Sequence, residues 1–244
     1  MKRILYFLSA FIGLSLAASC IEIDNFDAPS AQIHGRLIDK TTGENLLVDN
    51  GETHIRIWER SFGDNPNPQN LPVKLDGTYK NTRLFDGTYD MLPYDGAFWP
   101  CDTTYGVTIN KSDPEVNFEV VPYLHLVDFK YEIIGTYIEM SCKLQAPRVE
   151  GMPDVIEIRP FVNNLHFVGG TNMMGYYYVD KYTITLNKPW SELGDSEGNG
   201  YETYTFLLPL KAGYHYWIRM GAQVRNTFRN WNYTEIIEVE IPED

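Results

Sequence analysis

One stretch decides the fold class of this chain: residues 127–144, which read VDFKYEIIGTYIEMSCKL. Within it, apolar side chains occupy every second position in two series: Val127, Phe129, Tyr131 and Ile133, then Ile138, Met140, Cys142 and Leu144. Alternation with a period of two is the pattern of a strand with one buried face. It therefore predicts two β-strands and places Cys142 in the interior as a small hydrophobic residue.

The same alternation continues on both sides of this stretch, and no long helical periodicity interrupts it. Earlier strands are expected around apolar positions that share one face: Ile33, Gly35 and Leu37; Ile55 and Ile57; Val73 and Leu75; Tyr79; Tyr89; Val107 and Ile109; Val116, Phe118 and Val120. Later strands are expected near residues 155–163, 179–186, 203–208, 214–224 and 235–241. Such short strands separated by turns predict an all-β chain of two β-sandwich domains in tandem.

The N-terminus has the features of an export signal. Lys2 and Arg3 precede an apolar run over residues 4–16 that is too short to span a bilayer comfortably, and small residues then lead into Cys20. A small-residue box that ends in cysteine resembles the bacterial lipobox. This resemblance implies that residues 1–19 are removed as a signal peptide and that Cys20 is acylated, so that lipid holds the chain at a membrane; ordinary cleavage or a retained anchor is the alternative.

An acidic segment, residues 20–29, follows the lipobox. Its acids, Glu22, Asp24 and Asp27, resemble the export tag of Bacteroidetes surface lipoproteins, which implies a location on the outer membrane facing the cell exterior. The alternative is that this segment is a solvated tether that carries no export signal. The two domains are then expected at residues 30–122 and 123–244, with the boundary at Val121-Pro122-Tyr123.

Charge excludes one class of partner. The net charge is −13 and the isoelectric point is about 4.8, whereas proteins that bind nucleic acid draw their affinity from lysine and arginine. The same charge disfavours a peripheral hold on anionic lipid. With Cys20 lipidated, Cys101 and Cys142 remain, and because they fall in different expected domains no disulfide between them is expected.

Short motifs in each half resemble known sandwiches. Gly35-Arg36-Leu37-Ile38-Asp39, Thr42-Gly43 and Leu84-Phe85-Asp86-Gly87-Thr88-Tyr89 resemble the carboxypeptidase-regulatory, transthyretin-like domain over about 90 residues. In the second half, the spacing of Leu210, Gly213, Tyr216 and Arg219 resembles the tyrosine corner of fibronectin type III and immunoglobulin-like domains. This second resemblance implies that Tyr216 is structural, with a buried ring and a hydroxyl that satisfies a backbone group.

A wider resemblance covers nearly the whole mature chain. The lipobox, the two-domain order and the strings at residues 94–100 and 118–124 resemble a Bacteroidetes lipoprotein family of unknown function, encoded beside SusC/SusD-type outer-membrane transporters. The resemblance implies an accessory subunit of such a transporter that captures oligosaccharide or peptide. It carries over no catalytic residue and no cofactor.

Enzyme signatures are absent from the sequence. It contains no His-Glu-x-x-His, Gly-x-Ser-x-Gly or Cys-x-x-Cys motif and no glycine-rich phosphate loop, and its five histidines lack metal-ligand spacing. A non-catalytic protein is therefore expected, although paired carboxylates leave a glycoside hydrolase as a remote alternative.

Two local motifs remain open. Residues 195–200 half-resemble a calcium loop, but its terminal carboxylate position holds Phe206, so a polar turn is expected. Asp102-Thr103-Thr104 resembles the Bacteroidetes O-glycosylation acceptor.

Aromatic residues in loops are the candidate ligand-binding positions. A sugar ring presents an apolar face that can stack on an exposed aromatic ring, while nearby polar groups bind its hydroxyls. The candidates are Trp99, Tyr177, Trp190, Arg229, Trp231 and Tyr233. The competing interpretation is that Phe98-Trp99 fills the interface between the domains and that the protein is a docking subunit without a ligand of its own.

Overall fold

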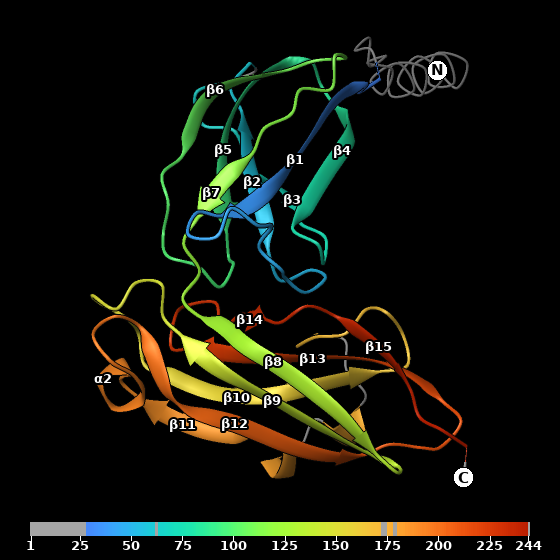
Figure 1. The fold of residues 1–244 in the computed structure, drawn as a ribbon. Helices are drawn as coiled ribbons and strands as arrows, with labels where there is room; N and C mark the ends of the chain where they lie inside the picture. The colour runs from blue at the N-terminus through green and yellow to red at the C-terminus, as the bar shows by residue number, and fades with distance from the viewer. Residues whose placement is uncertain (1–27, 62, 172–174, 178–179, 244) are drawn as a thin grey trace, which may run out of the picture.

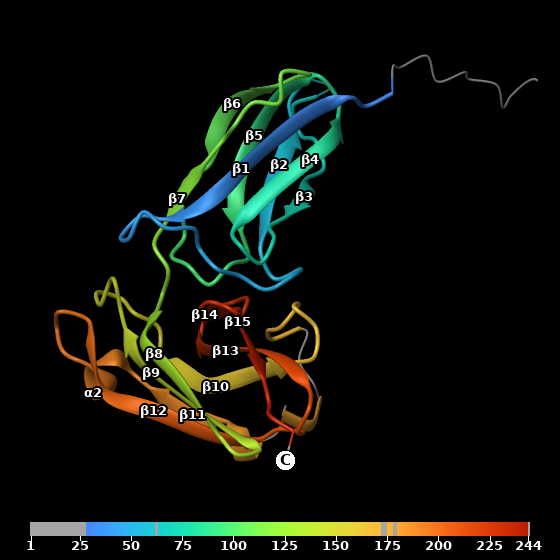
Figure 2. The same cartoon turned by 45° about the vertical axis from the view of Figure 1, so that its right-hand side comes forward.

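The computed structural model describes residues 28–61, 63–171, 175–177 and 180–243, which form two β-sandwiches in tandem (Figures 1 and 2). The all-β fold expected from the alternating pattern is confirmed. Among the described residues, no helix is long and apolar enough to cross a membrane.

The first sandwich consists of two sheets with the orders β4-β1-β7 and β3-β2-β5-β6. Strand β1 pairs in parallel with β7 and antiparallel with β4, and the second sheet is antiparallel throughout. The strand bounds are β1 (Ala31–Asp39), β2 (His54–Glu59), β3 (Gln69–Pro72), β4 (Thr78–Leu84), β5 (Gly87–Tyr94), β6 (Thr104–Ile109) and β7 (Phe118–Val120).

The predicted alternation holds along β1, where Ile33, Gly35 and Leu37 all face the core. Gly35 is required there because a Cβ atom would lie 1.8 Å from the carbonyl oxygen of Val116. The Tyr79 hydroxyl donates to that same carbonyl oxygen at 2.7 Å, which ties β4 to the segment before β7 across β1, within one sheet.

The second sandwich also consists of two sheets, β12-β9-β8 and β11-β10-β13-β14, with β15 pairing to the other end of β13. Its core is separate from that of the first sandwich and includes Cys142, which is fully buried as expected. The bounds are β8 (His125–Ile134), β9 (Tyr137–Gln145), β10 (Val155–Asn163), η2 (Gly175–Tyr177), η3 (Asp180–Tyr182), β11 (Ile184–Lys188), α2 (Trp190–Leu193), β12 (Asn199–Pro209), β13 (His215–Val224), β14 (Trp231–Tyr233) and β15 (Ile237–Glu240).

Three strand predictions need correction. Strand β3 ends at Pro72, before Val73, because residues 74–78 close a turn in which Lys74 and Thr78 are hydrogen-bonded. The strand expected at 179–186 begins only at Ile184, after the 3-10 turn η3. Residues 231–233, expected in a loop, form strand β14. Three residues are too few for an alternating apolar pattern to be recognised.

Tyr216 has the structural role that its motif implied. Its ring is buried in the second core, and its hydroxyl accepts a hydrogen bond of 3.1 Å from the backbone N–H of Lys211. The bond fastens the start of β13 to the turn that leads into it. The expectation of a tyrosine corner is therefore confirmed.

We expect Tyr216→Phe to lower the free energy of unfolding by about 1–2 kcal/mol, because the Lys211 N–H loses its partner in a partly buried position. Urea unfolding followed by fluorescence measures the change. Tyr214→Phe is the matched control, since its hydroxyl binds the Lys211 ammonium in solvent and its loss should cost less than about 0.5 kcal/mol. Equal effects of the two variants would contradict a corner that stabilises the domain.

Candidate functional site

The loops at one end of the first sandwich contact the sheet of the second sandwich that contains β10, β13 and β14 (Figures 1 and 2). A small apolar cluster lies at this junction, separate from both domain cores: Phe161, Val168, Trp231 and Tyr233. The Phe161 ring meets Trp231 and Tyr233 edge to face, with centroids 5.0 and 5.5 Å away. The junction therefore has its own aromatic core.

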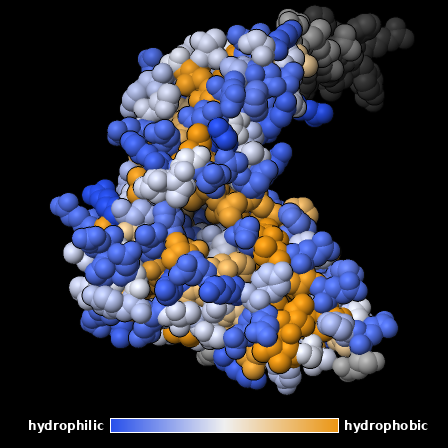
Figure 3. Space-filling view, in the orientation of Figure 1, coloured by the Kyte–Doolittle hydropathy of each residue, from blue (hydrophilic) through white to orange (hydrophobic). Residues whose placement is uncertain are grey.

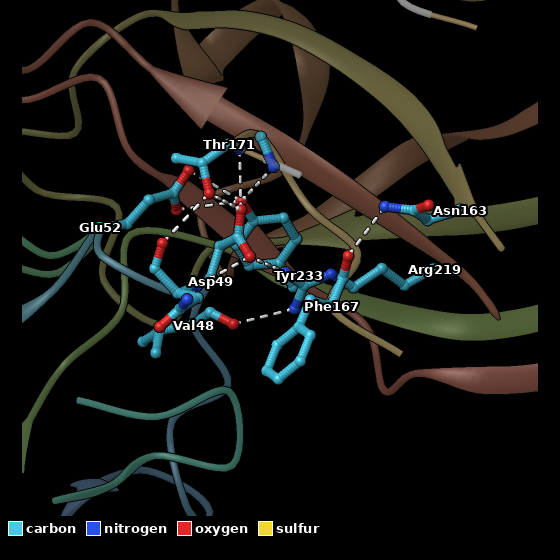
Figure 4. A network of polar contacts seen from close by, with 10 residues as sticks. Val48, Asp49, Glu52, Asn163, Phe167, Thr171, Arg219 and Tyr233 are labelled. Atoms are coloured by element: carbon cyan, nitrogen blue, oxygen red, sulfur yellow. Dashed lines mark hydrogen bonds and ion pairs between the residues drawn. The ribbon is translucent and has the colours of Figure 1, made fainter. Parts of the chain in front are cut away.

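A buried arginine crosses the junction. Arg219 lies on β13, on the face opposite the second core, and its side chain is fully buried. Its guanidinium donates to the carbonyl oxygen of Val48 at 2.9 Å and lies 3.4 Å from an Asp49 carboxylate oxygen (Figure 4). It also stacks 3.5 Å from the centroid of the Tyr233 ring. One side chain of the second sandwich thus engages the backbone and a carboxylate of the first.

Asp49 and Glu52, from the loop between β1 and β2, supply the acidic half of this network. Asp49 accepts hydrogen bonds from the Thr171 backbone N–H at 2.8 Å and from its hydroxyl at 2.7 Å. Glu52 accepts from the Tyr233 hydroxyl, which is 3.0 Å from each of its carboxylate oxygens. Burial, reinforced by the nearby negative charge of Asp49, raises the pKa of Glu52 from 4.5 to about 7, although Tyr233 and Arg219 oppose the shift.

Gly169 and Gly170, in the loop after β10, pack against this network. A Cβ atom on Gly169 would lie 2.2 Å from the Arg219 guanidinium, and one on Gly170 would lie 2.6 Å from the Glu52 carboxylate. Glycine is needed at both positions because the chain approaches the buried charges so closely.

Asparagine side chains complete the junction. Asn232 donates to the carbonyl of Ala97 at 2.8 Å and accepts from the backbone N–H of Leu124 at 3.1 Å. Asn230 donates to the backbone carbonyls of Glu52 and Asp95. Strand β14 and the residue before it are therefore bonded to two loops of the first sandwich and to the connection between the domains.

A cleft opens beside this junction, and we name it the Tyr94 cleft. It encloses about 280 Å³, and its walls come from both domains: from the first, the end of β5 and the loop that follows; from the second, the loop at 226–228. Its residues are Leu92, Pro93, Tyr94, Asp95, Gly96, Phe98, Pro100, Cys101, Tyr123, Asn226, Thr227 and Phe228. A mainly apolar hollow with a few polar groups at a domain interface is the usual form of a small-molecule site.

The aromatic rings of the Tyr94 cleft are held in defined positions. Phe228 is 41% exposed and meets Tyr94 edge to face with centroids 5.0 Å apart, and the Arg56 guanidinium covers the Tyr94 ring at 3.4 Å. Asp95, in the left-handed conformation at φ 58°, turns its carboxylate back to His54, with an Oδ2–Nδ1 distance of 2.9 Å. Burial raises the pKa of Asp95, although the bonds to His54 act against it.

A second, more polar cleft lies on the other side of the 98–101 segment, and we name it the Trp99 cleft. It encloses about 470 Å³ between the first sandwich and Arg148 of the second. The half-buried Trp99 ring lies between Tyr123, with centroids 5.1 Å apart, and the exposed Arg148 guanidinium at 4.2 Å. Polar groups line the rest of the cleft, and they are Lys40, Asp102, Thr104, Asn117 and Glu119.

The structure places the candidate residues from the sequence in different environments. Trp231 and Tyr233 are only 6% and 8% exposed, so the expectation that they form an exposed platform is wrong: they belong to the aromatic core of the junction. Trp190 and Tyr177 are also buried, in the second core, where the indole N–H donates to Asp195 and the phenol to Pro209. Burying the apolar area of these four rings stabilises the folded chain, so they contribute to its packing.

Two candidates remain accessible. Arg229 is exposed, at φ 54°, next to the residues 226–228 that wall the Tyr94 cleft. Trp99 lines the Trp99 cleft and packs against the second core, while Phe98 packs in the first core. The pair therefore does lie at the domain interface. Sequence reasoning missed Tyr94, Tyr123 and Phe228, whose one signal was an aromatic residue next to a turn or a domain boundary.

Several other expectations concern lipid, thiols and metals. Cys20 and the 1–19 signal peptide, like Tyr178, lie outside the described residues. Cys101 and Cys142 are not joined by a disulfide. The Asp195 carboxylate accepts from the backbone N–H groups of Glu197 and Asn199, as in a polar turn. Within the described ranges, no three His, Cys, Asp or Glu side chains are grouped to hold a metal ion.

The raised pKa of Glu52 makes the junction sensitive to pH. The folded chain keeps a proton on Glu52 that the unfolded chain releases near pH 4.5, so this stabilisation is complete below pH 4.5 and is lost as the pH rises through 7. We expect the free energy of unfolding of the wild type, relative to Glu52→Gln, to fall between pH 5 and pH 8 by up to about 3 kcal/mol.

Urea unfolding of both proteins at pH 5, 6, 7 and 8 measures this difference. Glu44→Gln, an exposed acid in the same region, is the control and should show no such trend. A constant difference between wild type and Glu52→Gln over this range would show that Glu52 does not titrate there.

Comparison with known proteins identifies relatives of this fold. Residues 31–121 match the family model described as protein of unknown function (DUF3823), N-terminal domain. No curated protein matches the chain. A solved Bacteroides uniformis chain, described as a putative carbohydrate binding protein, is 23% identical, with a TM-score of 0.73 over 87% of this chain and 99% of that one.

Two solved DUF3823 family proteins are similar over the same extent. One from Bacteroides uniformis is 23% identical, with a TM-score of 0.69 over 88% of this chain and 100% of its own. One from Parabacteroides merdae is 18% identical, with a TM-score of 0.65 over 88% and 100%. The chain therefore carries a match to the DUF3823 N-terminal domain and shares its tandem-sandwich fold with Bacteroidetes proteins of the DUF3823 family.

Proposed function

We propose that this protein is a non-catalytic surface lipoprotein that binds glycan at its domain junction. The observation that carries the proposal is the Tyr94 cleft, where Tyr94, Tyr123 and Phe228 line a hollow whose lining also includes Asp95 and Asn226. Aromatic faces accept the apolar C–H surface of a sugar, and carboxylate and amide groups bind its hydroxyls.

The junction keeps this cleft in place without a ligand. Its walls come from two domains that are joined by buried charged and amide hydrogen bonds, so little order is lost when a ligand binds. The description of the Bacteroides uniformis neighbour as a putative carbohydrate binding protein agrees with this assignment.

Anchoring and partnership are proposed from the sequence. The lipobox at Cys20 and the acids after it support a lipid anchor on the outer membrane with the domains facing outward. The resemblance to lipoproteins encoded beside SusC/SusD-type transporters supports a role as an accessory subunit in glycan uptake. The lack of catalytic motifs supports binding without cleavage.

One observation favours the alternative of a docking subunit without its own ligand. A shallow apolar groove crosses the junction away from the Tyr94 cleft, between Leu47 and Leu75 of the first sandwich and His166 and Ile236 of the second. Figure 3 shows hydrophobic residues gathered where the domains meet and continuing down the second domain. Phe167, beside the groove, is 53% exposed. Exposed apolar surface of this kind is typical of protein contacts.

We expect native electrophoresis of the full chain in gels that contain amylopectin, mixed-linkage β-glucan, xylan, mannan or polygalacturonate to show retardation by at least one of the neutral polysaccharides. Tyr94→Ala and Phe228→Ala should each weaken binding about threefold to tenfold, because each removes one aromatic contact with the sugar.

Tyr131→Ala is the matched control for this experiment. Tyr131 is a 45% exposed aromatic residue on β8, and it lies outside the Tyr94 cleft. Its loss should leave retardation unchanged. A wild-type protein that migrates freely through all five gels would contradict glycan binding and favour the docking alternative.

We expect the full-length gene product to be recovered with the membrane fraction and to carry a fatty-acyl mass on Cys20. Cys20→Ser should release the chain from membranes, because the proposed anchor is the acyl group on this cysteine. Intact mass and detergent phase partitioning measure both effects. An unmodified Cys20 thiol in the wild-type protein would refute the anchor and leave glycan binding untouched.

A further inference from the structure

The Tyr94 cleft and the Trp99 cleft adjoin along a shared ridge. Pro93, Pro100 and Cys101 line both clefts, and of these three Pro100 is exposed. The segment that forms this ridge is fixed: Trp99 donates its backbone N–H to Val121 at 2.8 Å, and Tyr123 donates to Ala97 at 3.2 Å. The two clefts are therefore adjoining compartments of one surface at the domain junction.

Size separates the two compartments. The Tyr94 cleft, at about 280 Å³, lies at the lower end of the range of roughly 300–1,000 Å³ that is usual for ligand sites, so it suits a short sugar. The Trp99 cleft adds about 470 Å³ in direct continuation. A ligand that fills both must be a chain that crosses Pro100.

The Trp99 cleft has the chemistry of a second sugar position. Arg148 covers one face of the Trp99 ring, but the side chain is exposed and can move aside to admit a sugar ring. The Trp99 indole N–H is buried and has no hydrogen-bond partner within the described part of the chain, so the indole would contribute its ring face and not its N–H to this position. Asp102 and Thr104 on the rim offer further partners for hydroxyl groups.

Charge distinguishes between glycan classes. The Trp99 cleft carries charges of both signs, Lys40 and Arg148 against Asp102 and Glu119, while Asp95 lines the Tyr94 cleft. Neither cleft concentrates positive charge, and the chain as a whole has a net charge of −13. A polyuronate or sulfated chain would therefore be repelled, whereas a neutral one would not.

We infer that the ligand is a neutral oligosaccharide of several units, bound as a chain that runs from the Tyr94 cleft over Pro100 onto Trp99. This inference rests on the proposed glycan function and adds its substrate class and a second subsite. In this inference, Tyr94 and Phe228 contact sugar units of every ligand. Trp99 and Asp102 contact sugar units that only longer ligands possess.

The test is calorimetric titration of the full chain with ladders of one to six units of α-1,4-glucan, β-1,4-glucan, β-1,4-xylan and β-1,4-mannan oligosaccharides. For the ladder that binds, we expect the wild-type affinity to rise at least tenfold between two and five units. Trp99→Ala should abolish most of that rise while leaving the two-unit affinity within about twofold. Tyr94→Ala should weaken both lengths by about threefold to tenfold.

Asp102→Ala keeps the test decisive if Trp99→Ala fails to fold, because Asp102 is exposed and should weaken only the longer ligands, by about threefold. Tyr131→Ala is again the control.

Equal wild-type affinity for two and five units, or equal loss at both lengths in the Trp99 and Asp102 variants, would overturn the second subsite while leaving glycan binding intact. Stronger retardation in the polygalacturonate gel than in any gel with a neutral polysaccharide would overturn the assignment of a neutral ligand. Failure of every ladder and of every polysaccharide gel would overturn the proposed function itself.

Discussion

The arrangement of the two domains depends on one buried charge, the Arg219 guanidinium. Moving an isolated charge out of water is costly, and truncating one partner of a buried pair typically destabilises a protein by about 3–5 kcal/mol. Here the carbonyl of Val48, the carboxylate of Asp49 and the ring of Tyr233 surround the charge, and these groups come from both domains. The guanidinium makes these contacts only while the sandwiches remain together.

This constraint determines which surfaces can act as a site. Both clefts include residues of the two sandwiches, so their complete walls form only in the joined arrangement. Asn230 and Asn232 extend the same bonding to the loop that contains Asp95 and Ala97, and Asp95 lines the Tyr94 cleft. The residues that hold the domains together and the residues that line the clefts are therefore neighbours along the chain but have different roles.

The alternation of apolar and polar residues predicted the all-β fold, because this pattern depends only on which face of each strand is buried. The observed burial alternates as predicted along β1 and β9. The tyrosine corner could be predicted because Tyr216 and Lys211 are close in sequence. The site could not be predicted in the same way. Trp231 and Tyr233 look like loop aromatics until β14 pairs with β13 and the first domain covers them. Arg219 and Asp49 lie 170 residues apart, and no sequence pattern reveals that distant loops meet.

Strand β1 runs along the length of the first sandwich. The chain enters at Ala31, at the pole of the first sandwich opposite the second, and nine extended residues carry it toward the other domain (Figure 1). At about 3.3 Å per residue, that path covers roughly 30 Å. For a chain tethered at its N-terminus, the first sandwich would then act as a spacer between the tether and the domain junction.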